Sequence, residues 1–141
     1  MQIDKTITRW SEAVAAFVRT RIARIPFDDG VTFAFVCQHS GLSDREAIDA
    51  LSMKHFPILD ADAMREYGQY RPKTPDKIWI SDRLCREFRR NPGDDGWQQL
   101  LEASILHELM HWAWRNKDEP YEVGEAFERA AYGRILTRES K

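Results

Sequence analysis

The sequence has little cysteine, and its two thiols, Cys37 and Cys85, exclude a scaffold held together by several disulfides. One disulfide between Cys37 and Cys85 is an alternative, but two reduced thiols are the expected state. No apolar run approaches the roughly 20 residues that a membrane helix needs, which excludes a membrane-spanning chain and a membrane partner. The N-terminus also lacks the apolar stretch of a classical secretory signal. We therefore expect a cytoplasmic protein, or one exported without such a signal.

The chain has no excess of positive charge. Its 21 Lys and Arg residues stand against 23 Asp and Glu residues, which gives a net charge of −2. A nucleic-acid partner is not expected, because the chain has no general attraction to phosphate. Four arginines between residues 83 and 90 alternate with acidic and apolar residues, which is typical of a solvated helix face.

Repeats, low-complexity segments and Ser/Gly-rich linkers are also absent. The 141 residues, of which 43% are hydrophobic and 31% charged, suit one globular domain over residues 1–141. The spacing of apolar residues predicts helices over residues 7–25, 43–53, 82–89, 97–115 and 122–136. β-branched and aromatic residues predict strands over 31–37 and 77–80, with a loop over 56–75 that contains one helical turn near 61–66. Many helices and few strands indicate an α+β fold with a small sheet.

The motif HELMH lies within the most strongly patterned of these helices, at residues 107–111. Side chains four residues apart on a helix point the same way, so His107 and His111 can hold one Zn²⁺ ion at about 2.0–2.1 Å. Glu108 lies too far round the helix to be a third ligand. It is placed to accept a proton from a zinc-bound water, whose pKa zinc lowers to about 7.

A catalytic zinc site needs a third protein ligand. No histidine follows His111, so this ligand should be one of five carboxylates: Asp118, Glu119, Glu122, Glu125 or Glu128. Asp118 and Glu119 lie in the turn and are expected to be too close to the helix end to reach His107. The last helix returns antiparallel to the motif helix and is the natural donor of the ligand.

On that last helix the interpretation favours Glu128 as the ligand, with Glu125 as the alternative. Glu128 borders the apolar stripe and stacks with Gly124 and Ala131, whose small side chains allow two helices to approach closely. Glu125 points nearly opposite the stripe. Glu122, at the start of the helix, is expected to contribute nothing to metal binding.

These residues resemble a known class. HELMH followed by a carboxylate on the next helix resembles the gluzincin class of zinc metallopeptidases. The segment GEAFERAAYG at residues 124–133 is similar to a GxxFExxxYG segment of small bacterial metallopeptidase domains, including toxin-type effector domains carried on secretion-spike proteins. That pattern implies that Glu128 binds the metal. The resemblance covers residues 97–133, without the third histidine of metzincins or the NExxSD segment of thermolysin.

The resemblance implies a zincin-like fold, with an active-site helix and a ligand helix packed on a small, mostly antiparallel sheet. In such folds an extended peptide pairs with an edge strand above the metal, and residues 77–80 are the candidate for that strand. Tyr132 is a candidate donor to the oxyanion of the transition state, and Tyr121 is a second phenol near the ligand helix.

The sequence therefore predicts a zinc-dependent metallopeptidase, with one Zn²⁺ per chain and Glu108 as the catalytic base. The substrate is a protein or a peptide, with a cell-wall peptide as one alternative. An effector of this kind implies a cognate inhibitor or immunity protein as a partner. Two rival functions stay open: a SprT-like protease that acts on DNA-bound proteins, and a non-enzymatic interaction module held together by a structural metal.

Overall fold

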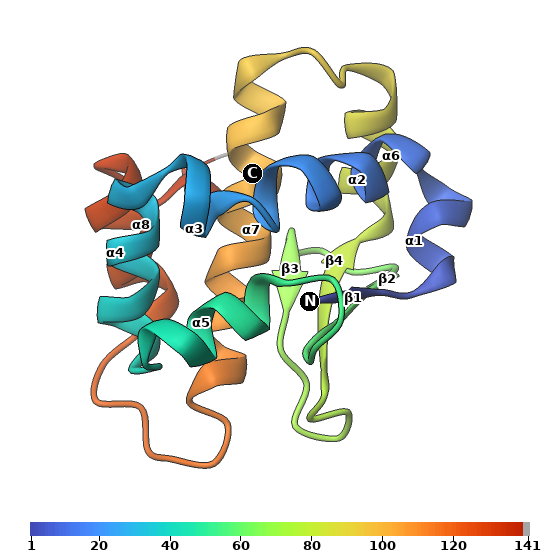
Figure 1. The fold of residues 1–141 in the computed structure, drawn as a ribbon. Helices are drawn as coiled ribbons and strands as arrows, with labels where there is room; N and C mark the ends of the chain where they lie inside the picture. Colours follow the sequence, from blue (N-terminus) through green and yellow to red (C-terminus); the bar gives the residue numbers. More distant parts are fainter. Residues whose placement is uncertain (140–141) are drawn as a thin grey trace.

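The computed structural model describes residues 1–139 and has an α+β fold, as predicted. Its longest helix, α7 (Asp95–Ala113), runs through the middle of the molecule. Helices α4 (Gly30–Ser40) and α8 (Val123–Tyr132) pack on one side of α7, and the sheet and α6 (Asp82–Arg90) contact it from the other (Figure 1). No helix within residues 1–139 is long and apolar enough to cross a membrane.

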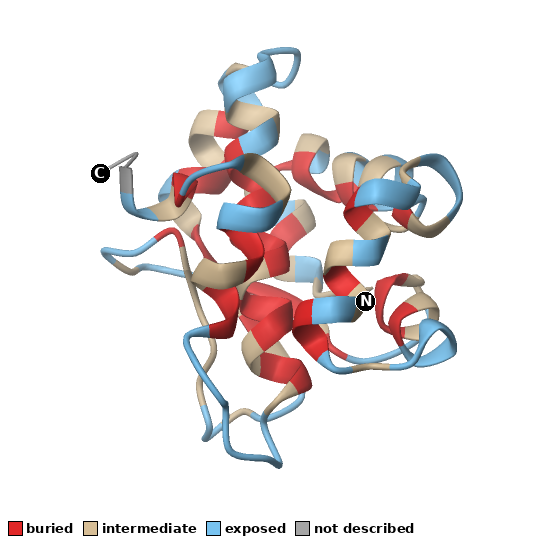
Figure 2. Ribbon diagram, turned by 90° about the vertical axis from the view of Figure 1, so that its left-hand side faces the viewer, coloured by how far each residue is buried: buried red, intermediate tan, exposed pale blue. Residues whose placement is uncertain are grey.

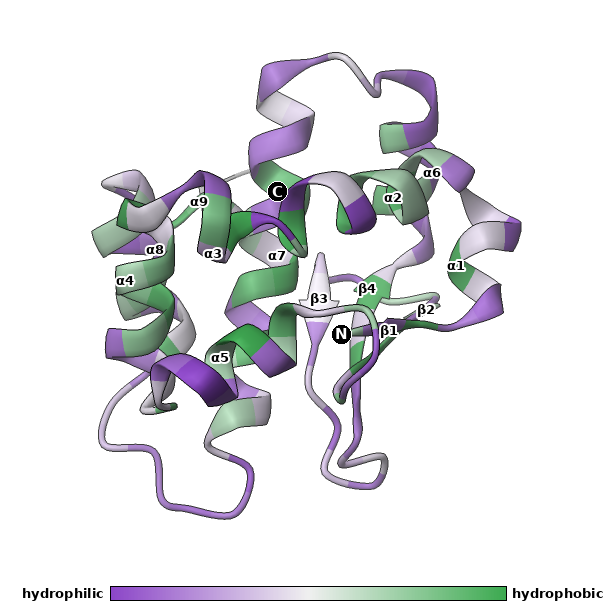
Figure 3. Cartoon of the chain, in the orientation of Figure 1, coloured by the Kyte–Doolittle hydropathy of each residue, from purple (hydrophilic) through white to green (hydrophobic). Residues whose placement is uncertain are grey.

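Helix α7 is central because its sequence is apolar on almost every side. The side chain of Asp94 caps its N-terminus by accepting a hydrogen bond from the backbone N–H of Trp97 at 2.9 Å. Twelve of its 19 residues are buried, and the red band in Figure 2 follows them through the core. A helix with apolar residues on most of its faces is stable only when neighbours cover those faces. Figure 3 shows green bands in the middle of α7, with purple bands between and above them.

The sheet is mixed and has the strand order β1-β2-β4-β3. Its strands are β1 (Gln2–Ile3), β2 (Ile58–Asp62), β3 (Gly68–Gln69) and β4 (Lys77–Ser81). The β1–β2 and β2–β4 pairs are parallel, and only β3 pairs antiparallel with β4. The expectation of a mostly antiparallel sheet is therefore wrong, because the helices between β1 and β2 form a long crossover that returns the chain in the same direction.

The strand predicted at residues 77–80 exists as β4, but it is not the edge strand that was expected. Strand β4 lies between β2 and β3, and Ile78 and Ile80 are fully buried. The edge strand beside α7 is β3, which the sequence analysis placed in a loop. A two-residue strand that begins with glycine carries no alternation that a sequence pattern could detect.

The strand predicted over residues 31–37 is also wrong, because this segment belongs to helix α4. β-branched and aromatic residues favour strands only weakly when a helix can bury them. Here Asp29 caps the helix by accepting from the backbone N–H of Thr32 at 3.0 Å, and Gly41 ends it in the left-handed conformation at a φ of +69°. The packing of α4 against α7 and α8 overrides the strand propensity.

Two more segments differ from the prediction. The helix expected over residues 7–25 is broken at Ser11, which ends α1 and caps α2 through the backbone N–H of Val14 at 3.2 Å. Residues 58–62 form the buried strand β2 instead of a loop with a helical turn, since the carboxylate of Asp60 in the middle of it is neutralised by Lys77 at 2.7 Å. The bounds in this half are α1 (Lys5–Trp10), α2 (Glu12–Phe17), the π-helix η1 (Val18–Ile22) and α3 (Ile25–Asp28).

The other predicted helices are confirmed, with shifts of a few residues at their ends. Helix α5 (Asp44–Leu51) has a capping box in which Ser43 and Glu46 each bond the other's backbone N–H. Ser81 caps α6 by accepting hydrogen bonds from the backbone N–H groups of Arg83 and Leu84. Helix α8 is shorter than predicted because Gly133 ends it at a φ of +78°, and a short helix α9 (Leu136–Glu139) follows.

Candidate metal centre and cleft

Helix α7 brings His107 and His111 together on one face. Their Nε2 atoms lie 3.3 Å apart, and Glu108 offers a carboxylate oxygen to the same group of three residues. Two ligands that are each about 2.0–2.1 Å from a tetrahedral zinc ion are about 3.3–3.4 Å apart. The spacing of the two Nε2 atoms therefore suits two ligands of one such ion.

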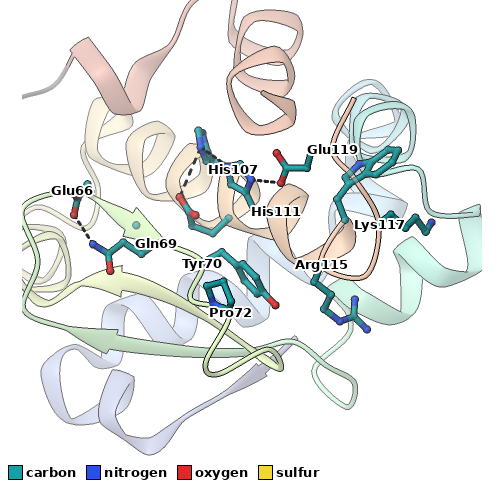
Figure 4. Close-up of a pocket in the computed structure, with 12 residues that line it drawn as sticks. Glu66, Gln69, Tyr70, Pro72, His107, His111, Arg115, Lys117 and Glu119 are labelled. Carbon is teal, nitrogen blue, oxygen red and sulfur yellow. Dashed lines mark hydrogen bonds and ion pairs between the residues drawn. The ribbon is translucent and has the colours of Figure 1, made fainter. Parts of the chain in front are cut away.

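The other ring nitrogen of each histidine faces a carboxylate. Nδ1 of His107 lies 2.5 Å from Glu128. Nδ1 of His111 lies 2.6 Å from Glu119 (Figure 4). A carboxylate that accepts a hydrogen bond from Nδ1–H keeps the proton on Nδ1 and so leaves the lone pair of Nε2 free. Both imidazoles are thereby held with their lone pairs directed toward the same point.

A third acceptor converges on this point from the start of α8. Oε1 of Glu122 lies 3.2 Å from Nε2 of His111 and 3.8 Å from Nε2 of His107. Glu122 is also the N-cap of α8, where its carboxylate accepts from the backbone N–H groups of Gly124 and Glu125. Three lone-pair donors this close repel one another unless a cation or a proton lies among them, so the donor set fits a metal ion.

Glu128, which the sequence analysis favours as the third ligand, lies apart from this group. It is fully buried, and its oxygens accept hydrogen bonds from the backbone N–H and the hydroxyl of Thr137 as well as facing Nδ1 of His107. The alternative, Glu125, is ion-paired with Arg138. Sequence reasoning thus missed Glu119 and Glu122, although the position of Glu122 just before a helix was the signal that it could cap that helix and point its carboxylate back toward the motif.

Glu108 is buried beside the two histidines, with 6% of its surface exposed. Burial raises the pKa of its carboxyl to about 7, although the nearby histidines oppose this shift. The edge strand β3 packs directly over it, since a Cβ atom on Gly68 would lie 2.9 Å from Cγ of Glu108. Only glycine lets the strand approach the carboxylate this closely.

The group opens into a cleft of about 490 Å³ that is lined by α7, by the chain that follows it and by β3. Figure 4 shows His107 and His111 at one wall and Tyr70 and Pro72 facing them. A second hollow of about 190 Å³ is lined in part by α8 and α9, and it shares Gly68, His107 and Glu108 with the first. The reactive group is therefore accessible from two adjoining hollows.

The close approach of α8 to α7 depends on Gly124, as its small size suggested. A Cβ atom on Gly124 would lie 2.5 Å from the ring of His107. We expect Gly124→Ala to lower the free energy of unfolding by about 1–3 kcal/mol and to weaken metal binding, because the ring or the helix must move. Urea denaturation and metal content measure the two effects.

The matched control is Gly30→Ala, since a Cβ atom there meets nothing within 4 Å. Its effect on the free energy of unfolding should stay within about 0.5 kcal/mol. Equal stability and equal metal content in the two variants would contradict the close packing of α8 on His107.

Tyr132 and Tyr121, the predicted candidates for oxyanion stabilisation, are both engaged elsewhere. The hydroxyl of Tyr132 donates to Glu102 at 2.8 Å and does not line the cleft, and the hydroxyl of Tyr121 faces His39 at 3.4 Å. The phenol that does line the cleft is Tyr70, whose hydroxyl donates to the carbonyl oxygen of Pro75 at 3.1 Å.

Cys37 and Cys85 are both free thiols. Burial raises the pKa of Cys37 to about 11 and that of Cys85 to about 12. Neither is a thiolate at neutral pH, which argues against nucleophilic catalysis by cysteine.

A cluster of metal-binding side chains on one helix, facing an open cleft beside an edge strand, is typical of metal-dependent peptidases. Comparison with known families agrees with this class: a family model described as Metallopeptidase toxin 3 matches residues 12–133, and the chain belongs to that family. The match spans α2 to the end of α8 and so includes the whole candidate site. No curated protein and no solved structure matches the chain.

Proposed function

We propose that the protein is a zinc-dependent peptidase of toxin type that hydrolyses an amide bond in a protein or peptide. The observation that carries the proposal is the convergence of two Nε2 lone pairs and a carboxylate oxygen beside a buried glutamate with a pKa of about 7. The family, a group of metallopeptidase toxins, supports the same reaction class.

In this proposal His107 and His111 hold the ion through Nε2, and Glu122 replaces Glu128 as the third ligand. Glu128 and Glu119 instead fix the orientation and tautomer of the two rings by accepting from Nδ1. The residue types of this set, two histidines and a glutamate, are those that the sequence predicts, but the glutamate is Glu122 instead of Glu128.

A zinc ion would supply a Lewis acid that polarises the substrate carbonyl and lowers the pKa of a bound water. Glu108 accepts the proton of the attacking water at its carboxylate and returns it to the leaving amine. Burial of Glu108 raises its pKa by favouring the protonated carboxyl, which helps it hold this proton between the two halves of the transfer.

Strand β3 would align the substrate. Its partner β4 occupies one edge only, so the backbone of Gly68 and Gln69 has its other edge available to an extended peptide. Both residues line the cleft, and Gly68 lies over Glu108. In this proposal β3 takes the role that the sequence analysis gave to residues 77–80.

The rival functions have less support. The family match names a metallopeptidase toxin, which supports neither a SprT-like protease nor a purely structural module. A metal with only a structural role would also not need a buried proton acceptor next to the histidines, which is the role that this proposal gives to Glu108.

A direct test combines elemental analysis with a cleavage assay. The purified protein should contain one equivalent of zinc and should cut peptides from a protein digest. Chelation should remove both the zinc and the activity, and added zinc should restore both. Cleavage that persists after complete removal of metal would refute the proposal.

Removal of the metal should also make stability depend on pH. Burial raises the pKa of Glu108 from 4.5 to about 7. Burial alone would lower the pKa of His107, but the hydrogen bond to Glu128 and the neighbouring carboxylates outweigh it and raise this pKa as well. The folded chain then binds more protons than the unfolded chain, so the free energy of unfolding falls as pH rises above about 4.5.

We therefore expect the melting temperature of the chelated protein to fall between pH 5 and pH 8, and to fall less steeply in Glu108→Gln, which has no carboxyl to ionise at that position. Zinc should restore stability most at pH 8, where its ligands are deprotonated. A melting temperature of the chelated protein that rises over this range would contradict the assignment.

A further inference from the structure

We infer that the cleft selects peptides that carry an acidic side chain, aspartate or glutamate, on one side of the cleaved bond. The residues that select it are Arg115 and Lys117, at the end of the cleft beyond α7. The inference rests on the proposed peptidase function, because it assigns a substrate preference to the same site.

The position of the two cations in the cleft sets the side of the bond. Both lie in the chain that follows α7, beyond His111 and after the last helical residue, Ala113. A substrate paired with β3 would therefore present to them the residues on one side of its cleaved bond. Figure 4 shows Arg115 and Lys117 at the same end of the cleft, beyond His111.

Both cations are oriented by tryptophans and lack a carboxylate partner. The guanidinium of Arg115 lies 4.1 Å from the ring centre of Trp112 and donates to its carbonyl oxygen at 3.0 Å. Nζ of Lys117 lies 5.5 Å from the ring centre of Trp114. Within residues 1–138 neither cation has a carboxylate oxygen at ion-pair distance, and the charge of Lys117 acts on the carboxylate of Glu46 only from farther away.

The other arginines around the cleft have their charge neutralised. Arg71, in the segment that follows β3, is ion-paired with Asp62 at 2.9 Å. Arg138, which lines the second hollow, is ion-paired with Glu125. Among the Lys and Arg side chains that line the two hollows, the charges without an ion pair are therefore those of Arg115 and Lys117, which makes the preference one-sided with respect to the bond.

An apolar wall strengthens the interaction at this end. Trp114 and Tyr70 line the cleft next to the two cations. The indole N–H of Trp114 donates to the carbonyl oxygen of His39 at 2.9 Å, and its ring packs on Gly41, where a Cβ atom would lie 3.1 Å away. A rigid aromatic surface that excludes water makes a nearby ion pair stronger than one in open solvent.

The test profiles cleavage in a peptide library made by tryptic digestion of a bacterial lysate. We expect the parent to show Asp and Glu enriched about 5- to 10-fold at one position on one side of the cut. In Arg115→Gln/Lys117→Gln this enrichment should vanish, while peptides that are neutral at that position are cut within about twofold of the parent rate. Lys73→Gln removes one exposed charge from the loop outside the cleft and is the matched control.

A second readout separates this inference from the proposed function. Binding of a fluorescent peptide with a glutamate at the selected position, and of its glutamine counterpart, is measured by anisotropy on Glu108→Gln. The acidic peptide should bind about 5- to 10-fold more tightly, and the double substitution should remove the difference.

The outcomes differ for the two ideas. Cleavage without any acidic preference, or with the same preference in the double variant, overturns the inference and leaves the peptidase function standing. If nothing is cleaved but the acidic peptide binds more tightly, the peptidase function is overturned. The inference that Arg115 and Lys117 bind an acidic side chain then still holds. Equal affinities for the two peptides overturn the inference in either case.

Discussion

Replacement of Glu108 by glutamine is expected to reduce peptide hydrolysis by about 10²–10⁴-fold while zinc stays bound. The substitution removes the proton acceptor and keeps the size of the side chain beneath Gly68. His107 and His111 are unchanged, so the metal ligands remain. A colorimetric or fluorescent peptide assay, together with elemental analysis of the same sample, measures both properties.

The matched control is Glu87→Gln, which makes the same chemical change on the surface of α6. It should leave hydrolysis and zinc content as in the parent. If Glu108→Gln cuts peptides as fast as the parent, Glu108 is not the proton acceptor, and the mechanism proposed above is wrong.

The second large effect separates the three glutamates of the last helix and its cap. Glu122→Ala should weaken zinc binding by more than about 100-fold, because it removes an oxygen that converges with the two Nε2 atoms. Glu128→Ala should cost about 10–100-fold, since it removes the partner that orients His107 without removing a ligand. Zinc affinity, measured by competition with a chelating dye, ranks the variants.

Glu125→Ala is the control, because this carboxylate pairs with Arg138 and should leave zinc affinity unchanged. A loss that is greatest in Glu128→Ala would restore the ligand favoured by the sequence pattern. A loss confined to Glu125→Ala would move the ligand to the alternative residue. Since Glu122 also caps α8, circular dichroism of Glu122→Ala checks that the helix persists.

The sequence predicts helix α7 and its motif better than it predicts the elements that pack around them. Helix α7 and its motif can be predicted because apolar periodicity and the spacing of two histidines are local properties of the chain. The helix caps at Ser43 and Ser81 are local features of the same kind. The family resemblance at residues 124–133 was also local, and it agrees with the family match over residues 12–133.

The misplaced elements depend on contacts that are distant in sequence. Helix α4 contains a strand-forming sequence and is helical because α7 and α8 bury it. Strand β2 contains two aspartates, and its central one is acceptable only because Lys77 of the neighbouring strand pairs with it. The role of each glutamate depends on how α8 enters, which Gly124 and the cap at Glu122 determine together.

The two histidines belong to α7, whereas the three carboxylates that surround their rings all lie within residues 119–128. An ion bound by ligands from both segments would link the motif helix α7 to the chain that follows it. Its binding free energy would then add directly to the stability of that junction. Supply of the ion would thus determine how stably the chain after α7 packs against the rest, and with it the resistance of residues 114–122 to proteases.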